Sequence, residues 1–408
     1  MLFYRLLIII LSPVILGHII WKSVSNKQRR YFWQRLGFNY AKLPKNCLWF
    51  HCASVGEVNT LLPLLKNLHS KNKTLNFIIT TNTITGSKIV KQQKLDYLFH
   101  SYLPFDWRFS IKRFLKTVNP ATLYVLETEI WPNLFDLCFN NGVAIHIINA
   151  RLSSKTTTAK PWIKSLLKTA LSKVDTISAR LEQEAQAYEL LGADKNKIST
   201  VGNLKLTTAL NNNKSTQDNN FSINRDYVLV ASTHDDEELQ IYTIWKKLDR
   251  EELLIIAPRH PERAASIVKI LDCDNLSIRS KKQPITDKTR VFLLDTVGEL
   301  KNYFKNAKLV IMGGSFTPIG GHNILEPASY NSTIITGPYM ENFKEELELM
   351  IDKNAIIQVS SYDVLDKELT KLLDDDNYRT SLQNNTNELT HNAEVILDSY
   401  TTLILKKT

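Results

Sequence analysis

Cysteine is scarce in this sequence, and its few cysteines are not spaced for disulfide or metal chemistry. The four among 408 residues, Cys47, Cys52, Cys138 and Cys273, include no C-x-x-C pair. This pattern favours buried thiols in a reducing compartment over a disulfide framework. Other combinations of His, Cys and carboxylate residues also lack the spacing of a metal-ligand set. We therefore expect a protein that works with no metal and no cofactor.

Internal repeats and RNA-binding motifs are also absent. No similarity recurs at a period of about 20–50 residues, which argues against a solenoid. The formal charge of +10 indicates an anionic partner. Because basic and aromatic residues interleave only in residues 27–38, we do not expect that partner to be nucleic acid. A nucleotide and an acidic membrane surface remain as candidates.

The chain opens with an uncharged apolar run, Leu6–Trp21, headed by Arg5. The run is slightly short for a hydrocarbon core of ~30 Å unless residues 2–4 join it and Arg5 snorkels. Basic residues follow it directly, and positive charge holds the adjoining side of an apolar helix in the cytoplasm. We expect an uncleaved anchor at residues 1–22. A cleaved signal peptide, ending near Ser23–Ser25, is the competing interpretation.

The segment after the apolar run, residues 23–44, combines basic and aromatic side chains. Its centre, Lys27–Phe38, reads KQRRYFWQRLGF. Such a composition is typical of a membrane interface, where the segment contacts acidic headgroups. A solvated basic linker is the alternative interpretation of the same residues.

The rest of the chain alternates apolar strands with helix-like segments, which predicts an α/β protein of two Rossmann-like, doubly wound sheets. In the first half, polar residues follow the strands where each strand ends. Ligands of such folds bind at the carboxyl ends of the strands. On an extended backbone, Glu127 and Glu129 share one face. The residues at this edge are Glu57, Glu127, Glu129, Asn149 and Arg151.

The second half contains two Gly-rich turns within Val291–Pro338, one before Glu299–Phe304 and one before Ile324–Ala328. Each turn is predicted to present free N–H groups at a helix start, which is an anion site most often occupied by phosphate.

The boundaries we predict are 1–22 for the anchor, 23–44 for the interfacial segment, 45–206 for the first domain, 207–225 for an Asn/Ser/Thr-rich linker, 226–385 for the second domain and 386–408 for a C-terminal helix.

Two Rossmann-like halves joined by a linker predict a cleft between facing sheet edges. This is the GT-B arrangement of glycosyltransferases, which other two-domain α/β proteins share. Ten segments, in order along the chain, resemble the 3-deoxy-D-manno-octulosonic acid (Kdo) transferases of Gram-negative bacteria. They are HCASVGEV at His51–Val58, TTNTITG at Thr80–Gly86, YLPFDWRFSIKRFL at Tyr102–Leu115, ETEIWPNL at Glu127–Leu134, NARLSSKT at Asn149–Thr156, VGNLKL at Val201–Leu206, STHDDEE at Ser232–Glu238, PRHPER at Pro258–Arg263, DTVGEL at Asp295–Leu300 and GGHNILEPA at Gly321–Ala328.

The resemblance implies an inverting, metal-independent transfer of Kdo from CMP-Kdo to a lipid A precursor, lipid IV(A). Glu57 matches the catalytic base of the family, and Glu127 and Lys205 match positions that support the transition state. The implied CMP contacts are Pro258, Arg259, Val297, Gly298, Glu299, Asn323, Ile324, Leu325 and Glu326. The acceptor contacts we expect are Ser54, Gly56, Thr83, Glu129, Asn149 and Arg151. The implied location is the bacterial inner membrane, with membrane lipids as partners and both domains on the cytoplasmic side.

Several of these residues also have a simpler interpretation. A glutamate at a turn, such as Glu57 or Glu326, commonly caps a helix, and a single lysine such as Lys205 is usually a solvated surface charge. Two other functions also fit the sequence. One is a different GT-B transferase that uses a UDP-sugar on a membrane lipid, and the other is a membrane-tethered nucleotide-sugar-binding protein without catalysis.

Overall fold

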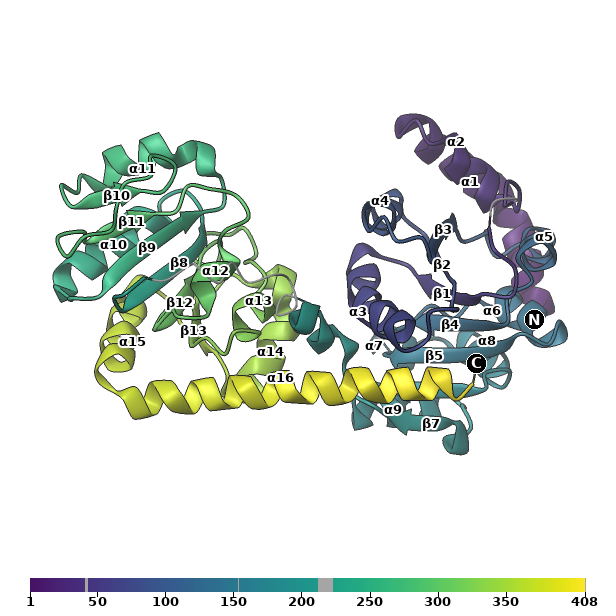
Figure 1. The fold of residues 1–408 in the computed structure, drawn as a ribbon. Helices are drawn as coiled ribbons and strands as arrows, with labels where there is room; N and C mark the ends of the chain where they lie inside the picture. The colour runs from purple at the N-terminus through teal and green to yellow at the C-terminus, as the bar shows by residue number, and fades with distance from the viewer. Residues whose placement is uncertain (41–42, 153, 212–222, 408) are drawn as a thin grey trace. The chain divides into compact units, whose positions relative to one another are not determined.

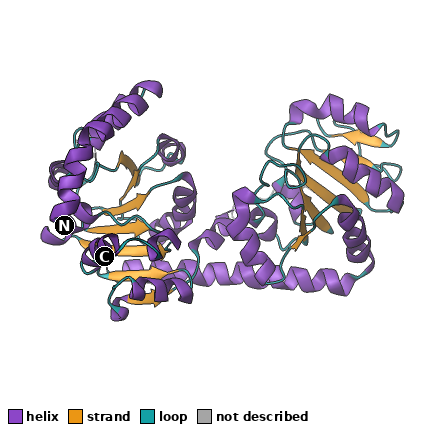
Figure 2. Cartoon of the chain, turned by 180° about the vertical axis from the view of Figure 1, so that it is seen from behind, coloured by secondary structure: helices purple, strands orange, loops and turns teal. Residues whose placement is uncertain are grey.

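The chain folds as two α/β units. The computed structural model describes all residues except 41–42, 153, 212–222 and 408. One compact unit comprises Met1–Leu204 with Ile396–Thr408, and the other comprises Lys205–Val395. The described part of each unit contains a seven-stranded parallel sheet with helices on both faces (Figures 1 and 2). This confirms the prediction of two doubly wound sheets, whereas the cleft between them stays a prediction.

The sheet of the first unit has the strand order β3-β2-β1-β4-β5-β6-β7, and its neighbouring strands are parallel. Most of these strands are short apolar runs buried on both faces, as parallel sheets require. The strands are β1 Leu48–Cys52, β2 Phe77–Thr81, β3 Leu98–Tyr102, β4 Thr122–Leu126, β5 Ala144–Ala150, β6 Thr176–Ala179 and β7 Ile198–Thr200. The helices are α3 Val55–Lys71, α4 Ile84–Gln92, α5 Arg108–Val118, α6 Pro132–Asn140, α7 Ser154–Thr157, α8 Pro161–Leu171 and α9 Glu182–Leu190, with the 3₁₀ turn η1 Lys195–Lys197.

Alternate residues of the central strand β1 enter two separate hydrophobic cores. Trp49 packs on one face against Phe114 of α5, with ring centroids 4.6 Å apart. Phe50 points to the other face, stacks on Tyr124 at 4.9 Å and packs near Leu61 of α3. Because apolar side chains cover both faces, the carboxyl edge of the sheet is the part that remains for polar residues.

The sheet of the second unit has the order β10-β11-β9-β8-β12-β13-β14 and is also parallel. Its strands are β8 Tyr227–Thr233, β9 Leu253–Pro258, β10 Leu276–Ile278, β11 Val291–Leu293, β12 Leu309–Met312, β13 Ile334–Thr336 and β14 Ile357–Gln358. Its helices are α10 Glu237–Leu248, α11 Ala264–Leu271, α12 Lys301–Phe304, α13 Leu325–Ala328, α14 Lys344–Asp352 and α15 Tyr362–Asp374, with 3₁₀ turns η2 Leu204–Asn211, η3 Pro261–Arg263 and η4 Glu341–Phe343. The helices predicted after the two Gly-rich turns, α12 and α13, are thus single turns.

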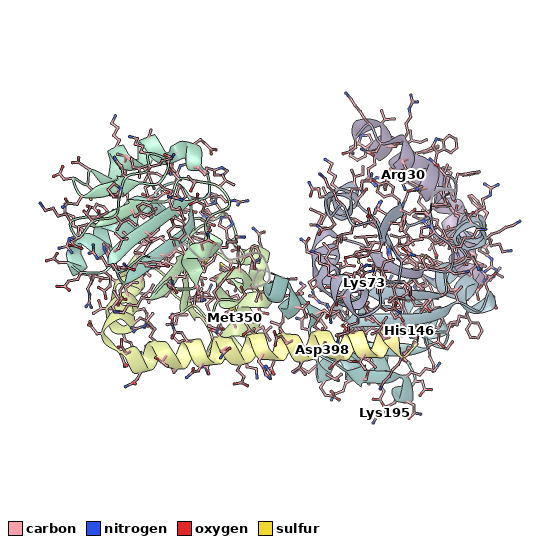
Figure 3. The ribbon with its side chains drawn as sticks, in the orientation of Figure 1. Arg30, Lys73, His146, Lys195, Met350 and Asp398 are labelled. Carbon is pink, nitrogen blue, oxygen red and sulfur yellow. The ribbon has the colours of Figure 1, made fainter. Side chains whose placement is uncertain are left out.

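The last helix, α16 Asp376–Leu405, begins in the second unit and ends in the first. Its first turn is capped by Asp375, whose Oδ1 accepts from Tyr378 N at 2.9 Å. The helix therefore starts earlier than the predicted residue 386. Asp398 (Figure 3) forms an ion pair with Lys71 of α3 at 2.8 Å. The segment predicted as a linker begins with the 3₁₀ turn η2, and residues 212–222 of that segment lie outside the described residues.

Helices α1 Leu2–Ser25 and α2 Arg29–Arg35 belong to the first unit. α1 extends beyond the predicted apolar run at both ends, and by length and composition it could cross a membrane. It packs beside α2 on a cluster that includes Tyr31, Tyr102 and Trp107 (Figure 1). The apolar segment is therefore part of the folded unit.

Candidate active site

Glu57 lies in the first turn of α3, directly after the carboxyl end of β1. Its Oε2 accepts from Ala53 N at 2.8 Å, and its Oε1 accepts from Ser54 Oγ at 2.9 Å. Ser54 is the N-cap of the helix and accepts from Glu57 N at 3.3 Å. These reciprocal bonds form a helix cap, so the simpler interpretation of Glu57 describes its contacts correctly. Each carboxylate oxygen still has a second lone pair with which it can accept a proton.

The environment of Glu57 makes it an unusual cap. The residue is only 8% exposed. Burial, together with the nearby charges of Glu127 and Glu129, raises the pKa of Glu57 to about 7, although the bonds from Ala53 and Ser54 oppose the shift. A carboxylate with a pKa near 7 can accept and release a proton at neutral pH, which is what a general base requires.

Glu129 lies close to Glu57 but has the opposite shift. Burial raises its pKa, yet polar contacts with His51, Trp131 and Asn82 outweigh burial and leave the pKa below its usual range. Glu129 Oε2 accepts from Trp131 Nε1 at 2.8 Å and from Asn82 Nδ2 at 3.2 Å. His51 Nε2 lies 3.7 Å from the same oxygen. Glu129 is therefore held as an anion beside a carboxyl group that protonates readily.

Glu127 follows β4 but does not continue it. Its φ of +55° is left-handed, and its N–H donates to Ile148 O at 3.1 Å. The hydroxyl of Tyr188 donates to the Glu127 carbonyl at 3.1 Å. The prediction that Glu127 and Glu129 share one face of an extended strand is therefore wrong, because the chain turns at Glu127. The charge of Glu127 nevertheless acts on Glu57, so the structure does bring the three carboxylates together.

The other residues expected to bind the acceptor have mixed environments. Thr83 caps α4 by accepting from Gly86 N at 3.1 Å, and a Cβ at Gly56 would lie in ordinary contact with Ser54 Oγ at 3.8 Å. Arg151 is half-buried, and its carbonyl accepts from Tyr188. Asn149 corrects the prediction, because it is fully buried and accepts from Leu204 N through Oδ1 at 2.9 Å. Asn149 therefore joins segments within the first unit and is not available to a ligand.

In the second unit, two histidines meet beside the central strands. His234 follows β8, His322 lies in the loop before α13, and their Nε2 atoms are 2.9 Å apart. Burial, the partner imidazole and Arg259 lower the pKa of His322 to about 4, and burial also lowers the pKa of His234. Arg259 follows the neighbouring strand β9, and its side chain is exposed. His260 is exposed as well, and its Nδ1 lies 3.3 Å from Glu262.

Part of the second Gly-rich turn is occupied by a carboxylate of the chain. Glu237, in the first turn of α10, accepts from Gly314 N at 2.7 Å, from Phe316 N at 2.9 Å and from His234 N at 2.9 Å. The N–H groups of Gly314 and Phe316 therefore already have an acceptor, and an anion site at the start of α13 stays a prediction. Gly313 is required for the same packing, because a Cβ there would lie 2.6 Å from Ser232 O.

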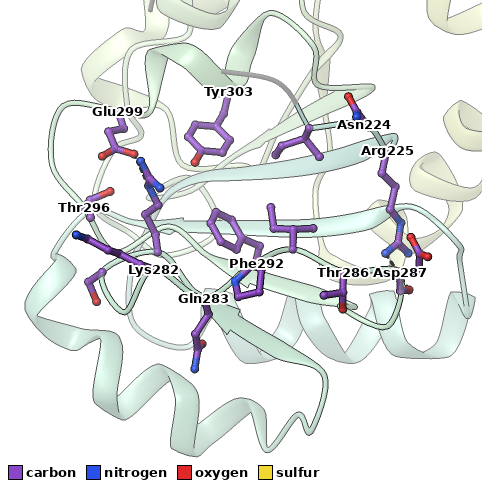
Figure 4. Close-up of a pocket in the computed structure, with 15 residues that line it drawn as sticks. Asn224, Arg225, Lys282, Gln283, Thr286, Asp287, Phe292, Thr296, Glu299 and Tyr303 are labelled. Atoms are coloured by element: carbon purple, nitrogen blue, oxygen red, sulfur yellow. Dashed lines mark hydrogen bonds and ion pairs between the residues drawn. The ribbon is translucent and has the colours of Figure 1, made fainter. Parts of the chain in front are cut away.

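The first Gly-rich turn borders a cavity of about 800 Å³ (Figure 4). Thr296 and Glu299 line one part of it, and Glu299 forms an ion pair with Arg279 at 2.7 Å. Gly298, with φ of +90°, and Val297 are exposed at the tip of the turn. The remaining lining residues are Ile223, Asn224, Arg225, Ser280, Lys282, Gln283, Pro284, Ile285, Thr286, Asp287, Phe292 and Tyr303.

In the run Asn323–Glu326, Ile324 and Leu325 are almost fully buried, whereas Asn323 and Glu326 are half-buried. Asn323 Oδ1 already accepts from Leu325 N at 3.1 Å. Glu326 is half-buried, and burial raises its pKa. Pro258 is buried at the end of β9.

Lys205 also has protein partners. Its Nζ lies 2.8 Å from Glu345 Oε2 and 3.8 Å from Glu346 Oε1, both in α14. Within the described residues, no group of three or more His, Cys, Asp or Glu side chains could hold a metal ion.

The sequence did not identify the partners of Glu129 or the carboxylate that fills the Gly-rich turn. His51 was visible as a polar residue inside an apolar strand, which is a usable signal. Trp131 lies in the segment ETEIWPNL, which resembles the family, but that resemblance implied no role for its side chain. Glu237 lies in the acidic run Asp235–Glu238, and nothing in that run indicates that its side chain is fully buried.

Two parallel, doubly wound sheets with polar groups at their carboxyl edges give the chain the GT-B fold. A glycosyltransferase from Rickettsia africae shares this fold, with a TM-score of 0.51, 11% identity and coverage of 89% of this chain and 98% of that chain. The family model described as 3-deoxy-D-manno-octulosonic-acid transferase (kdotransferase) matches residues 30–208. The 3-deoxy-D-manno-octulosonic acid transferase of Haemophilus influenzae is 33% identical over 395 residues, which cover 94% of this chain and 92% of that protein.

The chain therefore belongs to the 3-deoxy-D-manno-octulosonic acid transferase family and is an enzyme, a glycosyltransferase. One solved structure matches part of it. The C-terminal CMP-Kdo binding domain of WaaA from Acinetobacter baumannii is 32% identical, with a TM-score of 0.39, and the match covers 41% of this chain and 89% of that domain.

Proposed function

We propose that the enzyme transfers Kdo from CMP-Kdo to a sugar hydroxyl of a lipid A precursor, lipid IV(A), with inversion and with Glu57 as the general base. The observation that carries the proposal is the pair of opposite pKa shifts at one sheet edge. Glu57 has a pKa of about 7, whereas Glu129 stays ionised. Neighbouring carboxylates whose pKa values are pushed apart are typical of an acid–base site.

In the proposed step, the acceptor hydroxyl gives its proton to Glu57 while its oxygen bonds to the anomeric carbon of Kdo. The bond from that carbon to the phosphate oxygen of CMP breaks on the opposite face, and its electron pair leaves with CMP. Glu127 and Glu129 favour the positive charge that develops on the sugar ring. The charge of Glu127 also keeps the pKa of Glu57 high enough for it to accept a proton.

For the donor, we propose the carboxyl edge of the second unit. Arg259 is exposed there, and a guanidinium binds phosphate with two parallel hydrogen bonds. Val297–Glu299 and Asn323–Glu326 supply main-chain groups and carboxylates that suit a nucleoside. The Kdo carboxylate needs a cation, and Lys205 can serve only if it exchanges its contact with Glu345 for the ligand. Lys205 therefore belongs to the proposed donor site only when its ion pair with Glu345 is broken.

The test compares Glu57→Gln with Glu129→Gln in the full-length enzyme, using CMP-Kdo and lipid IV(A). Glutamine keeps the size of the side chain and can still accept from Ala53 N, so the helix cap survives the substitution. We expect Glu57→Gln to lose at least ~100-fold in kcat while CMP still raises the Tm. Near-normal transfer by Glu57→Gln would contradict the assignment of the base. A rise in Tm with UDP but not with CMP would contradict the donor.

We further propose that α1 attaches the enzyme to the cytoplasmic side of the bacterial inner membrane. The support is the apolar composition of α1 and the lipid nature of the proposed acceptor. Sedimentation of the full-length chain with membranes after a low-salt wash tests the attachment. Recovery of an intact chain entirely in the soluble fraction would contradict it.

A further inference from the structure

The amino-terminal end of α1 forms polar contacts with other residues of the first unit. Tyr4 Oη donates to Asp106 Oδ2 at 2.7 Å. Arg5 Nη2 lies 2.8 Å from Asp136 Oδ2, and Arg5 Nε donates to Asn133 at 3.2 Å. The sequence predicted that Arg5 would snorkel at the far end of a spanning helix. Instead, it forms an ion pair with the folded unit.

The middle and the carboxyl-terminal end of α1 contact the same unit. Ser12 Oγ accepts from Trp107 Nε1 at 2.9 Å, and Ile19 is almost fully buried. Lys22 Nζ lies 5.6 Å from the centre of the Tyr31 ring in α2. The contacts therefore recur along one stripe of the helix, over a length of about 36 Å for its 24 residues.

The opposite stripe of α1 is apolar and exposed. It is extended sideways by the exposed Trp162 of α8, which Phe3 meets at 5.4 Å between ring centroids. Phe109 of α5 is also exposed and stacks on Trp107 at 5.7 Å. A contiguous apolar surface of this kind marks an interaction site. We call it the apolar stripe; on α1 it consists of Leu2, Phe3, Leu6, Ile9, Ile10, Leu11, Val14, Ile20, Trp21 and Val24.

Exposed basic side chains follow the apolar stripe along the chain and also occur on α5 and α8. The sequence contains no Asp or Glu before Glu57. Lys27 and Arg29, at the end of α1 and the start of α2, are exposed. Exposed basic residues also occur on the neighbouring helices, with Lys112 and Arg113 on α5 and Lys164 on α8. An apolar face accompanied by cations fits an anionic lipid surface, because acyl chains cover the first and phosphates pair with the second.

We propose that α1 lies flat in one leaflet, with acyl chains covering the apolar stripe and anionic headgroups meeting these basic side chains. A helix that crosses the bilayer leaves only one end beside a cytoplasmic domain. The ion pair of Arg5 and the burial of Ile19 in a cluster with Ile84 and Tyr102 could not then coexist, because they hold opposite ends of α1 on one unit. The amino terminus therefore stays on the same side as the catalytic units. This inference rests on the proposed membrane attachment and not on the reaction.

The first experiment locates the amino terminus of the full-length enzyme with a protease-sensitive epitope tag before Met1. We expect the tag to survive protease treatment of intact spheroplasts and to be removed in inverted membrane vesicles. Cleavage in intact spheroplasts would overturn the proposal. Transfer to lipid IV(A) is measured on the same preparation, so loss of the proposed reaction and a wrong orientation give separate readouts.

The second experiment measures the depth of α1 in vesicles of phosphatidylethanolamine and phosphatidylglycerol. Bimane is attached to Leu2→Cys, Ile10→Cys or Val24→Cys in a Cys273→Ser background, since the other cysteines are buried. For a flat helix, nitroxides near the headgroups quench all three positions similarly. Quenching of Ile10→Cys by nitroxides deep in the bilayer, together with shallow quenching of both ends, would overturn the proposal.

The role of the basic side chains is tested with binding to the same vesicles. Arg29→Gln and Lys27→Gln are each expected to weaken binding about fivefold, which corresponds to ~1 kcal/mol per basic side chain. Lys195→Gln is the matched control, because Lys195 is exposed at the other end of the unit from Arg30 of α2 (Figure 3). Equal effects of all three substitutions would overturn the assignment of this face to the membrane.

Discussion

The Nε2 atoms of His234 and His322 lie 2.9 Å apart, so one ring donates a hydrogen bond and the other accepts it. This contact requires that at least one ring be neutral. It joins the end of β8 to the loop before α13, and Arg259 is close enough to disfavour any further positive charge.

Acid is therefore expected to loosen the second unit. The folded pKa of His322 is about 4, below the usual 6.5, so its contribution to stability is fully present above pH ~6.5 and is lost as pH falls towards 4. We expect the Tm of the wild type to fall over this window more than that of His322→Asn. His260→Asn is the control, because His260 is exposed. An identical pH dependence of all three proteins would contradict the expectation.

The pH dependence of transfer follows from Glu57. A base works only when deprotonated, so kcat/KM should rise with pH and level off above about 7, the pKa of Glu57. Glu57→Gln should have a low rate without this limb. The pH dependence of kcat/KM reports the pKa of Glu57 in the free enzyme, so the rate is measured at subsaturating acceptor concentrations. A limb that persists unchanged in Glu57→Gln would assign the titration to another group.

Stability should respond to Glu57 in the opposite sense to activity. The folded pKa of Glu57 is raised from 4.5 to about 7. The contribution of Glu57 to the unfolding free energy is therefore fully present below pH 4.5 and is lost as pH rises through 7. At pH 8 we therefore expect Glu57→Gln to be more stable than the wild type, by on the order of 1–3 kcal/mol. Urea unfolding at pH 5 and pH 8 measures this difference. A Glu57→Gln variant that is less stable at pH 8 would show that the helix cap outweighs the buried charge.

Removal of the Glu129 charge should move the titration of Glu57. Glu129 raises the pKa of Glu57, so in Glu129→Gln the acid limb of kcat/KM should shift to lower pH while kcat falls. Trp131→Phe deletes only the 2.8 Å bond to Glu129 and should produce a smaller fall in kcat. If the kcat/KM–pH profiles of the wild type and Glu129→Gln have the same acid limb, the charge of Glu129 does not affect the pKa of Glu57.

Glu237 should prove essential to the second Gly-rich turn. Glu237→Ala leaves two buried N–H groups, of Gly314 and Phe316, and the part-buried N–H of His234 without their acceptor, which is expected to cost about 2–4 kcal/mol of unfolding free energy. Urea unfolding provides the measurement. Asp235→Ala is the control, because that side chain is exposed and its bond to Arg263 is a surface ion pair worth at most about 1 kcal/mol. Similar losses for the two variants would contradict the role of Glu237.

Both sheets could be predicted because their strands are apolar runs between helix-like segments. Leu309–Met312 begins and ends where the apolar run does. The conformation of Glu127 could not be predicted, because it depends on Ile148 and Tyr188, which are distant in sequence. Glu237 likewise meets Gly314 across 77 positions. The sequence could not show which face of α1 packs on the first unit, because both faces are mostly apolar. Only the residues that α1 contacts distinguish the two faces.

The course of α16 has a consequence for synthesis on the ribosome. Tyr400 is buried in the first unit, where its hydroxyl contacts Asn149 N at 3.2 Å and Gly202 O at 3.1 Å. Domains generally fold in order as they emerge, but this unit lacks Ile396–Thr408 until the whole second unit has been synthesised. The first unit to be made is therefore the last to be completed. A premature stop after Val395 would leave the second unit intact and damage the unit that carries Glu57.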